Sequence, residues 1–187
     1  MAAREQDSVE TMVTYLEMTE PPTGVPRRAP CSGLEVRHAR RPTVSFYRYL
    51  YDTVGEPWHW TERRILDDAA LAEIIGDPLV EVNVLWADGV PAGYAELDRR
   101  VGGEIELAYF GLIPEFTGRG LGSWLLDWAT RHAWRDRPRR LWVHTCDLDD
   151  PRALPIYQRA GFQVYDRRPG RVPLLRPAMA PAPRAIP

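Results

Sequence analysis

The sequence predicts an α/β protein in which a mixed sheet carries helices on both faces, forming a three-layer sandwich. Three observations predict this class. Segments with the period of a strand alternate along the chain with segments of helical periodicity. A hairpin and a further strand form a continuous meander near the middle of the sequence. Hydrophobic residues make up 44% of the 187 positions, with seven Trp and eight Tyr, which is ample for a core.

Length and composition favour one domain with tails. We divide the chain into an N-terminal strand and Pro-rich loop (1–33), a main domain (34–168) and a Pro-rich C-terminal tail (169–187), expected to be disordered or extended. The formal charge of −2 predicts no general attraction to nucleic acid or membrane. No apolar run approaches the ~20 residues that span a bilayer. With two cysteines and no apolar signal segment, we expect a soluble cytoplasmic protein.

The N-terminal half is expected to contain two strands and two helices. Residues 8–18 alternate well enough for a strand, and residues 34–39 form the next one, which we expect to pair with the first. Pro42 suits a helix start, and residues 43–55 follow with their aromatic and leucine side chains on one side. An aromatic loop then leads to a short helix over 68–75.

The C-terminal half begins with the clearest hairpin of the sequence, whose turn is Asp88-Gly89. Pro155 sits inside a helical pattern, which predicts either a later helix start or a kink there. In order, the expected elements are strands over 80–86, 93–97 and 106–113, a helix over 123–134, a strand over 139–145, a helix that carries Tyr157, and a final strand over 162–168.

A buried strand is joined to the central helix through three glycines, Gly118, Gly120 and Gly122. The first N–H groups of a helix have no intrahelical partner, and together with the helix dipole they attract anions. Glycine lets the backbone approach a ligand closely, and Arg119 adds positive charge. The pattern therefore predicts a phosphate-bearing ligand that lies across residues 117–122.

This turn resembles motif A of the GCN5-related N-acetyltransferases, V-x-P-x-x-Q/R-x-x-G-x-G. Leu112-Ile113-Pro114 matches V-x-P and Gly120-Leu121-Gly122 matches G-x-G, whereas Thr117 stands where the family has Gln or Arg. A second stretch, DDPRALPIYQRAGF (149–162), resembles the last conserved helix of the family, N-x-x-A-x-x-x-Y-x-x-x-G-F, with Asp150 in the place of Asn. Two motifs in the right order, separated by a helix and a strand, make the resemblance specific.

The resemblance implies that residues 34–168 form an acetyltransferase domain with the acyl-CoA N-acyltransferase fold. In that fold two central parallel strands splay apart and acetyl-CoA lies in the cleft between them. Gly111 would permit a bulge there, or would merely relieve packing under Tyr109. The residues expected to bind acetyl-CoA are Phe110, Gly111, Leu112, Thr117, Gly118, Arg119, Gly120, Leu121, Gly122, Asp150, Ala153 and Tyr157.

Two residues are predicted to be catalytic. Tyr157 is the candidate general acid, because a phenol holds a proton at neutral pH that a leaving thiolate can accept. The alternative is a core tyrosine against the cleft wall. Glu106 resembles the strand carboxylate that histone-type members of the family use as a base. Glu96, His144 and Tyr109 are rival bases, and an ordinary exposed strand residue is the alternative for Glu106.

The pocket for the acceptor is expected to be built by the N-terminal half of the chain. An aromatic lining would suit an apolar or aromatic amine, or would stack on a cation, and ordinary core packing is the alternative. The residues expected to contact the acceptor are Tyr47, Tyr51, Trp58, Trp60, Tyr109 and His144.

The predicted function is acetyl-CoA-dependent N-acetyl transfer to a small-molecule or peptide amine by direct attack in a ternary complex. The alternatives are a non-catalytic acyl-CoA-binding sensor, or an acyltransferase with another donor or acceptor. No motif supports a route through an acyl group on Cys146, and no His/Cys cluster has metal-ligand spacing. The N-terminal segment and the C-terminal tail exceed what a minimal fold needs, which leads us to predict a homodimer.

Overall fold

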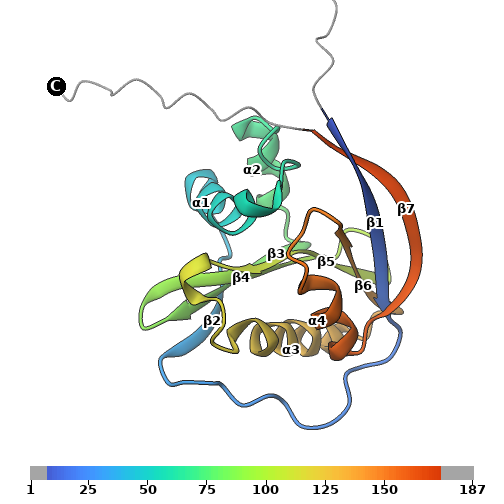
Figure 1. Cartoon of the computed structure of the whole chain (residues 1–187). Coiled ribbons are helices and arrows are strands. Elements are labelled where there is room, and N and C mark those ends of the chain that lie inside the picture. The colour runs from blue at the N-terminus through green and yellow to red at the C-terminus, as the bar shows by residue number, and fades with distance from the viewer. Residues whose placement is uncertain (1–7, 174–187) are drawn as a thin grey trace, which may run out of the picture.

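A computed structural model describes residues 8–173 of the chain as a seven-stranded mixed sheet with helices on both faces (Figure 1). The predicted fold class is therefore confirmed. The strand order is β2-β3-β4-β5-β6-β1-β7. The elements are β1 (Ser8–Met18), β2 (Leu34–His38), α1 (Val44–Gly55), η1 (Glu56–Trp58), α2 (Asp68–Gly76), β3 (Val80–Ala87), β4 (Val90–Asp98), β5 (Glu104–Leu112), η2 (Pro114–Phe116), α3 (Leu121–Ala133), η3 (Trp134–Asp136), β6 (Arg140–Cys146), α4 (Ala153–Ala160) and β7 (Gln163–Pro173).

The helix starts follow from local chemistry. The Thr43 hydroxyl accepts a hydrogen bond from the N–H of Phe46 and caps α1, and Asp67 caps α2 in the same way. Helix α4 begins at Ala153, so Pro155 is its third residue. The N–H that proline lacks would have no intrahelical partner in the first turn. The helix therefore starts late enough to need no kink at Pro155.

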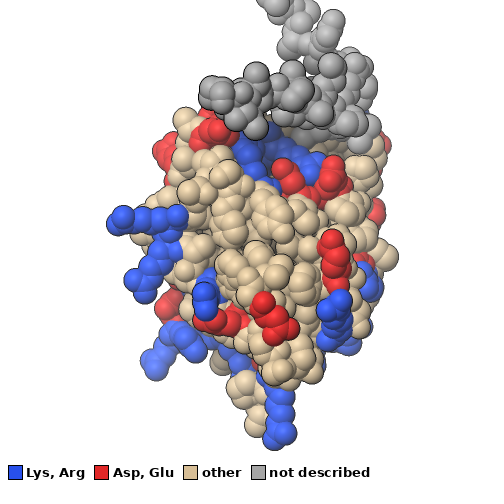
Figure 2. Space-filling view, turned by 90° about the vertical axis from the view of Figure 1, so that its left-hand side faces the viewer, with Lys and Arg blue, Asp and Glu red and all other residues tan. Residues whose placement is uncertain are grey.

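The core lies on both faces of the sheet. On one face α1 and α2 bury aromatic and aliphatic side chains such as Tyr47, Leu50 and Leu71 against β3, β4 and β5. On the other face α3 and α4 pack on the sheet through residues such as Leu126 and Tyr157. Figure 2 shows one side of the molecule, where the middle of the surface is mostly uncharged and the charged side chains lie toward its margins. Within residues 8–173, no helix is long and apolar enough to cross a membrane.

The first strand does not pair with the second, and this expectation was wrong. Strand β1 lies between β6 and β7, antiparallel to both, while β2 pairs with β3 at the opposite edge. The connecting loop runs past α3 (Figure 1), where the N–H of Arg27 donates to Asp127 over 2.9 Å. Strand β7 continues beyond Arg168 to Pro173 and pairs with β1 along its length. Residues 174–187 of the expected tail lie outside the described residues.

Strands β5 and β6 are parallel neighbours that separate part of the way along. Their pairing covers Glu104 with Arg140, Ile105 with Leu141 and Glu106 with Trp142. Beyond these pairs β5 runs on to Leu112 and β6 to Cys146 without pairing to each other. The facing backbone groups of these two segments are therefore not used by the sheet, and an opening forms at this point.

Candidate active site

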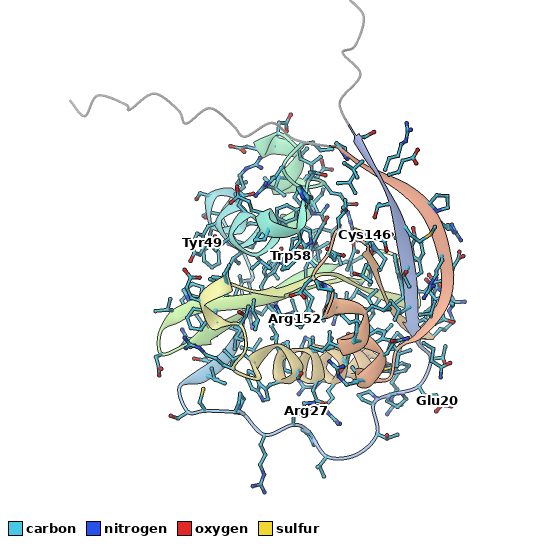
Figure 3. The ribbon with its side chains drawn as sticks, viewed as in Figure 1. Glu20, Arg27, Tyr49, Trp58, Cys146 and Arg152 are labelled. Carbon is cyan, nitrogen blue, oxygen red and sulfur yellow. The ribbon has the colours of Figure 1, made fainter. Side chains whose placement is uncertain are left out.

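A cleft of about 700 Å³ occupies the opening between β5 and β6. Such a volume lies within the range of small-molecule and cofactor sites. Its walls come from the loop after α1, from β5, from the glycine turn before α3, from the end of β6 and from α4, with further residues of β1 and β7. Figure 3 shows Trp58, Cys146 and Arg152 around the space between the two helical layers, and all three line the cleft.

The glycine turn forms one wall of the cleft. Gly118 and Gly120 have φ angles of 76° and 77°, a left-handed conformation that side-chain-bearing residues rarely adopt. Gly120 is the N-cap of α3 and, lacking a side chain, gives the helix no side-chain cap. The first-turn N–H groups of a 13-residue helix are thus left for another partner, next to a cleft. Thr117 lines the same wall, with its hydroxyl donating to the carbonyl of Pro114 over 2.9 Å.

Most of the residues expected to bind the cofactor line this cleft. Arg119 and Leu121 do not: Leu121 is 2% exposed in the core under α3, and the Arg119 guanidinium lies 5.5 Å from the centre of the Phe116 ring. Core packing holds the Leu121 side chain, and the Phe116 ring holds that of Arg119, outside the cleft lining. Those that line it are Phe110, Gly111, Leu112, Thr117, Gly118, Gly120, Gly122, Asp150, Ala153 and Tyr157.

Gly111 serves packing, and no bulge lies there. A Cβ at Gly111 would lie 2.3 Å from a methyl carbon of Val54 on α1, so glycine is what allows that helix to approach the sheet. The register shift between β4 and β5 instead leaves out Ala108, because Glu96 pairs with Tyr109 and Leu97 with Leu107. As a result Tyr109 joins the core under α1 while Leu107 joins the core under α3.

Tyr157 is a buried residue of α4 that lines the cleft. Its ring packs against Phe110 and Phe162, with centroid distances of 6.1 and 5.9 Å. Burial, and to a smaller extent the charge of Asp149, raises the pKa of the hydroxyl well above its ordinary value of 10. The hydroxyl makes no hydrogen bond to any residue between 8 and 173, so its proton is free for a ligand.

The aromatic side of the cleft contains five of the six residues expected to contact the acceptor: Tyr51, Trp58, Trp60, Tyr109 and His144. The exception is Tyr47, which is 0% exposed and belongs to the core. Its hydroxyl donates to Glu96, and the Arg63 guanidinium donates to the same carboxylate over 2.8 Å. Tyr47 faces the sheet because helix α1 turns that side of its surface toward β4.

The candidate bases differ in their burial, in their hydrogen-bond partners and in whether they line the cleft. Glu96 is fully buried and paired with Arg63, and the Tyr109 hydroxyl donates to Glu62 over 2.5 Å. Glu106 lies on β5 just before the strands separate and does not line the cleft. His144 does line it, and its Nδ1 lies 3.3 Å from a carboxylate oxygen of Glu106.

Several polar residues of the cleft were not predicted from the sequence, among them Asp149, Arg152 and Arg159. Asp149 accepts hydrogen bonds from Trp60 Nε1 (3.1 Å) and from the Thr145 hydroxyl (2.8 Å), which ties the loop after α1 to the loop before α4. Arg159 brings positive charge to the α4 wall, and Arg152 lines the same wall as an ion pair with Asp150. Asp149 and both arginines fall within the second motif stretch, so its charged positions could have drawn attention to them.

The described part of the chain brings no three His, Cys, Asp or Glu side chains together in a way that would hold a metal ion. Cys31 and Cys146 are both free thiols. Burial and the charge of Asp149 raise the pKa of the Cys146 thiol, which keeps it in the less nucleophilic protonated form. The chemistry of the cleft therefore rests on backbone donors, the tyrosine hydroxyl, the imidazole and the arginines.

Comparison with known structures gives the same fold. A GCN5-related N-acetyltransferase from Sphaerobacter thermophilus superposes with a TM-score of 0.61 at 19% identity, over 88% of this chain and 52% of that one. One from Kribbella flavida gives 0.58 at 18%, over 84% and 56%. The aminoglycoside N-acetyltransferase AAC(6')-Iy, in complex with CoA, gives 0.52 at 23%, over 83% and 99%. The chain thus spans little more than half the length of the first two structures.

A comparison with curated proteins gives no match in sequence. The sequence profile described as the acetyltransferase (GNAT) family matches residues 34–162, which is more than half of the chain. The chain therefore belongs to the acetyltransferase (GNAT) family.

Proposed function

We propose that the chain is an acetyl-CoA-dependent N-acetyltransferase that acts on a primary amine. The main support for the proposal is the position of the cleft. The cleft lies where β5 and β6 separate, between the start of α3, which has no side-chain cap, and the hydroxyl of Tyr157. This arrangement offers an anion site, a row of free backbone groups and a proton donor within one cavity. Family membership and the CoA bound to AAC(6')-Iy support the same proposal.

The residues of the cleft fit a CoA molecule. Gly118, Gly120 and Gly122 leave the turn open, and a Cβ at Gly118 or Gly120 would project into space without strong contacts from the protein. The N–H groups at the start of α3 suit a pyrophosphate, and Arg159 supplies positive charge, whereas Arg152 is paired with Asp150. When bound there, acetyl-CoA supplies an acyl group activated as a thioester.

The chain's own groups would then act at stated atoms. Backbone N–H groups on the side of β5 that is not paired with β6, around Phe110 to Leu112, donate hydrogen bonds to an oxygen on which negative charge develops. Tyr157 holds a proton on its hydroxyl throughout the neutral range and offers it to a departing thiolate. The aromatic residues Tyr51, Trp58 and Trp60 shield the reaction from water and contact the amine.

A thiol-release assay tests the proposal. Acetyl-CoA, propionyl-CoA and malonyl-CoA are each offered with a panel of primary amines that includes aliphatic diamines, aromatic ethylamines, aminoglycosides and amino acids. We expect release of free CoA that depends on the amine, and an amine product heavier by one acetyl group. The sequence contains no lysine, so acetylation of lysine side chains cannot produce a false signal. Tight CoA binding without release for any donor would indicate an acyl-CoA sensor instead.

A further inference from the structure

His144 and Glu106 form a pair that spans the point where β5 and β6 part. Glu106 takes part in the last parallel pair, with Trp142, and His144 follows two residues later on the same face of β6. The Nδ1 of His144 is buried and makes no hydrogen bond to any residue between 8 and 173, but it lies 3.3 Å from the Glu106 carboxylate, within the range of an ion pair. The other ring nitrogen, Nε2, makes no hydrogen bond to any residue between 8 and 173, and the side chain lines the cleft.

We propose that His144, through Nε2, is the base that removes a proton from the acceptor ammonium, and that Glu106 is a positioning residue that holds the ring. The inference rests on the proposed N-acetyltransferase function. One proton of the ammonium passes to Nε2 and from there to water. The freed lone pair forms the C–N bond and the C–S bond breaks. Tyr157 gives its proton to the departing sulfur, and a second proton of the nitrogen restores the phenol.

The rival bases are less suited to this role. Glu106 does not line the cleft, and Glu96 is 0% exposed and held by Arg63. Burial raises the pKa of Tyr109 far above 10, and its hydroxyl already donates to Glu62. His144 combines access to the cleft with a side chain whose ordinary pKa lies near neutrality.

Charged groups surround His144 from several elements. Glu106 faces it from β5, Glu62 from the loop after η1 and Asp149 from the loop before α4. Tyr15 on β1 packs its ring 5.9 Å from the imidazole, and Arg171 on β7, which also lines the cleft, is paired with Glu10. These three carboxylates give this side of the cleft a negative potential that would attract an ammonium group.

The titration of His144 reflects two opposing effects. Burial alone lowers the pKa of the imidazole, but the contact with Glu106 and the negative charges of Glu106, Glu62 and Asp149 outweigh it and raise the pKa above 6.5. At 3.3 Å the contact is longer than a well-formed charge-assisted hydrogen bond, so we regard it mainly as an ion pair. A base whose pKa lies close to the working pH is an efficient one.

NMR titration of the imidazole tests the pair without any acceptor. The chain has four histidines, and the spectrum of His144→Gln assigns the signal of His144 by its loss. We expect His144 to titrate above 6.5 in the wild type and at lower pH in Glu106→Gln. The matched control is Glu104→Gln, two residues earlier on the same strand, where the carboxylate pairs with Arg140. An unchanged titration in Glu106→Gln would overturn the positioning role.

Kinetics with acetyl-CoA and the best amine of the panel test the base. The wild-type rate should fall as the pH drops through the pKa of His144. His144→Gln should lose this acid limb and turn over roughly 10²–10⁴ times more slowly. Glu106→Gln should move the limb to lower pH without changing the affinity for CoA. If the wild type is active but the rate of His144→Gln still falls at low pH in the same way, the role of His144 as the base is refuted while the proposed acetyltransferase function stands. If no amine is acetylated, the proposed function fails, and the base role fails with it.

Discussion

Replacing Tyr157 by Phe removes one hydroxyl from the cleft and leaves the ring packed against Phe110 and Phe162. The hydroxyl makes no hydrogen bond to residues in the range 8–173, so its loss orphans no buried partner there. The substitution creates neither a large cavity nor an unsatisfied polar group, so we expect the free energy of unfolding to change by less than about 0.5 kcal/mol. The affinity for CoA should likewise stay close to that of the wild type.

The effect on rate follows from the protonation state of the phenol. Because burial and the charge of Asp149 raise its pKa well above 10, Tyr157 stays protonated across the working range. Loss of a positioned proton donor costs roughly 10²–10⁴ in rate. Loss of a hydrogen bond to a charged group costs about 1.5–3 kcal/mol, or roughly 10- to 150-fold. A phenol with so high a pKa is a weak acid, so we expect a loss at the low end of the first range, where the two ranges overlap. Both kcat and kcat/KM should therefore fall about a hundredfold in Tyr157→Phe.

The assay is CoA thiol release at saturating acetyl-CoA, run beside thermal unfolding of the same samples. Tyr49→Phe is the matched control, since it makes the same chemical change at a 45% exposed position of α1 that does not line the cleft. It should behave like the wild type in both measurements. A Tyr157→Phe variant with wild-type turnover would refute the role in protonation. A large loss of stability with little loss of rate would mean that the hydroxyl serves the core.

Three further predictions concern the scaffold. Arg63→Met removes the charged partner of the buried Glu96 carboxylate and leaves it only the hydroxyl of Tyr47. This should cost about 3–5 kcal/mol at neutral pH, measured by urea unfolding. Burial, offset only in part by Arg63, already raises the pKa of Glu96, and without Arg63 that pKa rises further. The folded variant then binds a proton more tightly than the unfolded chain, so its free energy of unfolding should increase as the pH falls through this pKa. A decrease in the stability of Arg63→Met on acidification would contradict this explanation. Gly111→Ala should cost about 1–3 kcal/mol through its clash with Val54, and Val54→Ala in the same chain should recover part of that loss; no recovery would mean that packing is not the reason for glycine. The homodimer stays a prediction, which light scattering at tens of micromolar checks, and a clean monomer with both termini intact would count against it.

Local signals made much of the fold predictable. The meander follows from alternating valines and from the Asp88-Gly89 turn, where both residues take positive φ angles. Thr43 and the apolar face of α1 likewise mark that helix within a few residues. The place of β1 between β6 and β7 could not be predicted, because strand pairing depends on partners more than 100 residues away, which leave no mark in the segment itself.

The candidate site was predictable in outline only. Gly118 and Gly120, which take positive φ angles, line the cleft together with residues of the α4 motif, as the spacing of the two motifs in the sequence indicated. Which aromatic and acidic side chains reach the opening depends on how α1 sits and on where β5 and β6 separate. Tyr47 lies in the core because of the position of α1. Glu106 does not line the cleft, whereas His144 does, because β5 and β6 separate just beyond Glu106.

We propose that a CoA pyrophosphate binds on the turn before α3, and calorimetric titration of CoA is the direct test. Wild type should bind at one site per chain. Gly120→Glu adds a carboxylate and a side chain to the turn, and its affinity should collapse while the fold persists. Gly89→Glu is the matched control, because Gly89 has a similar φ of 84° and lies in the β3–β4 turn away from the cleft. It should bind CoA like the wild type. Equal affinity in all three proteins would mean that the pyrophosphate does not bind on this turn.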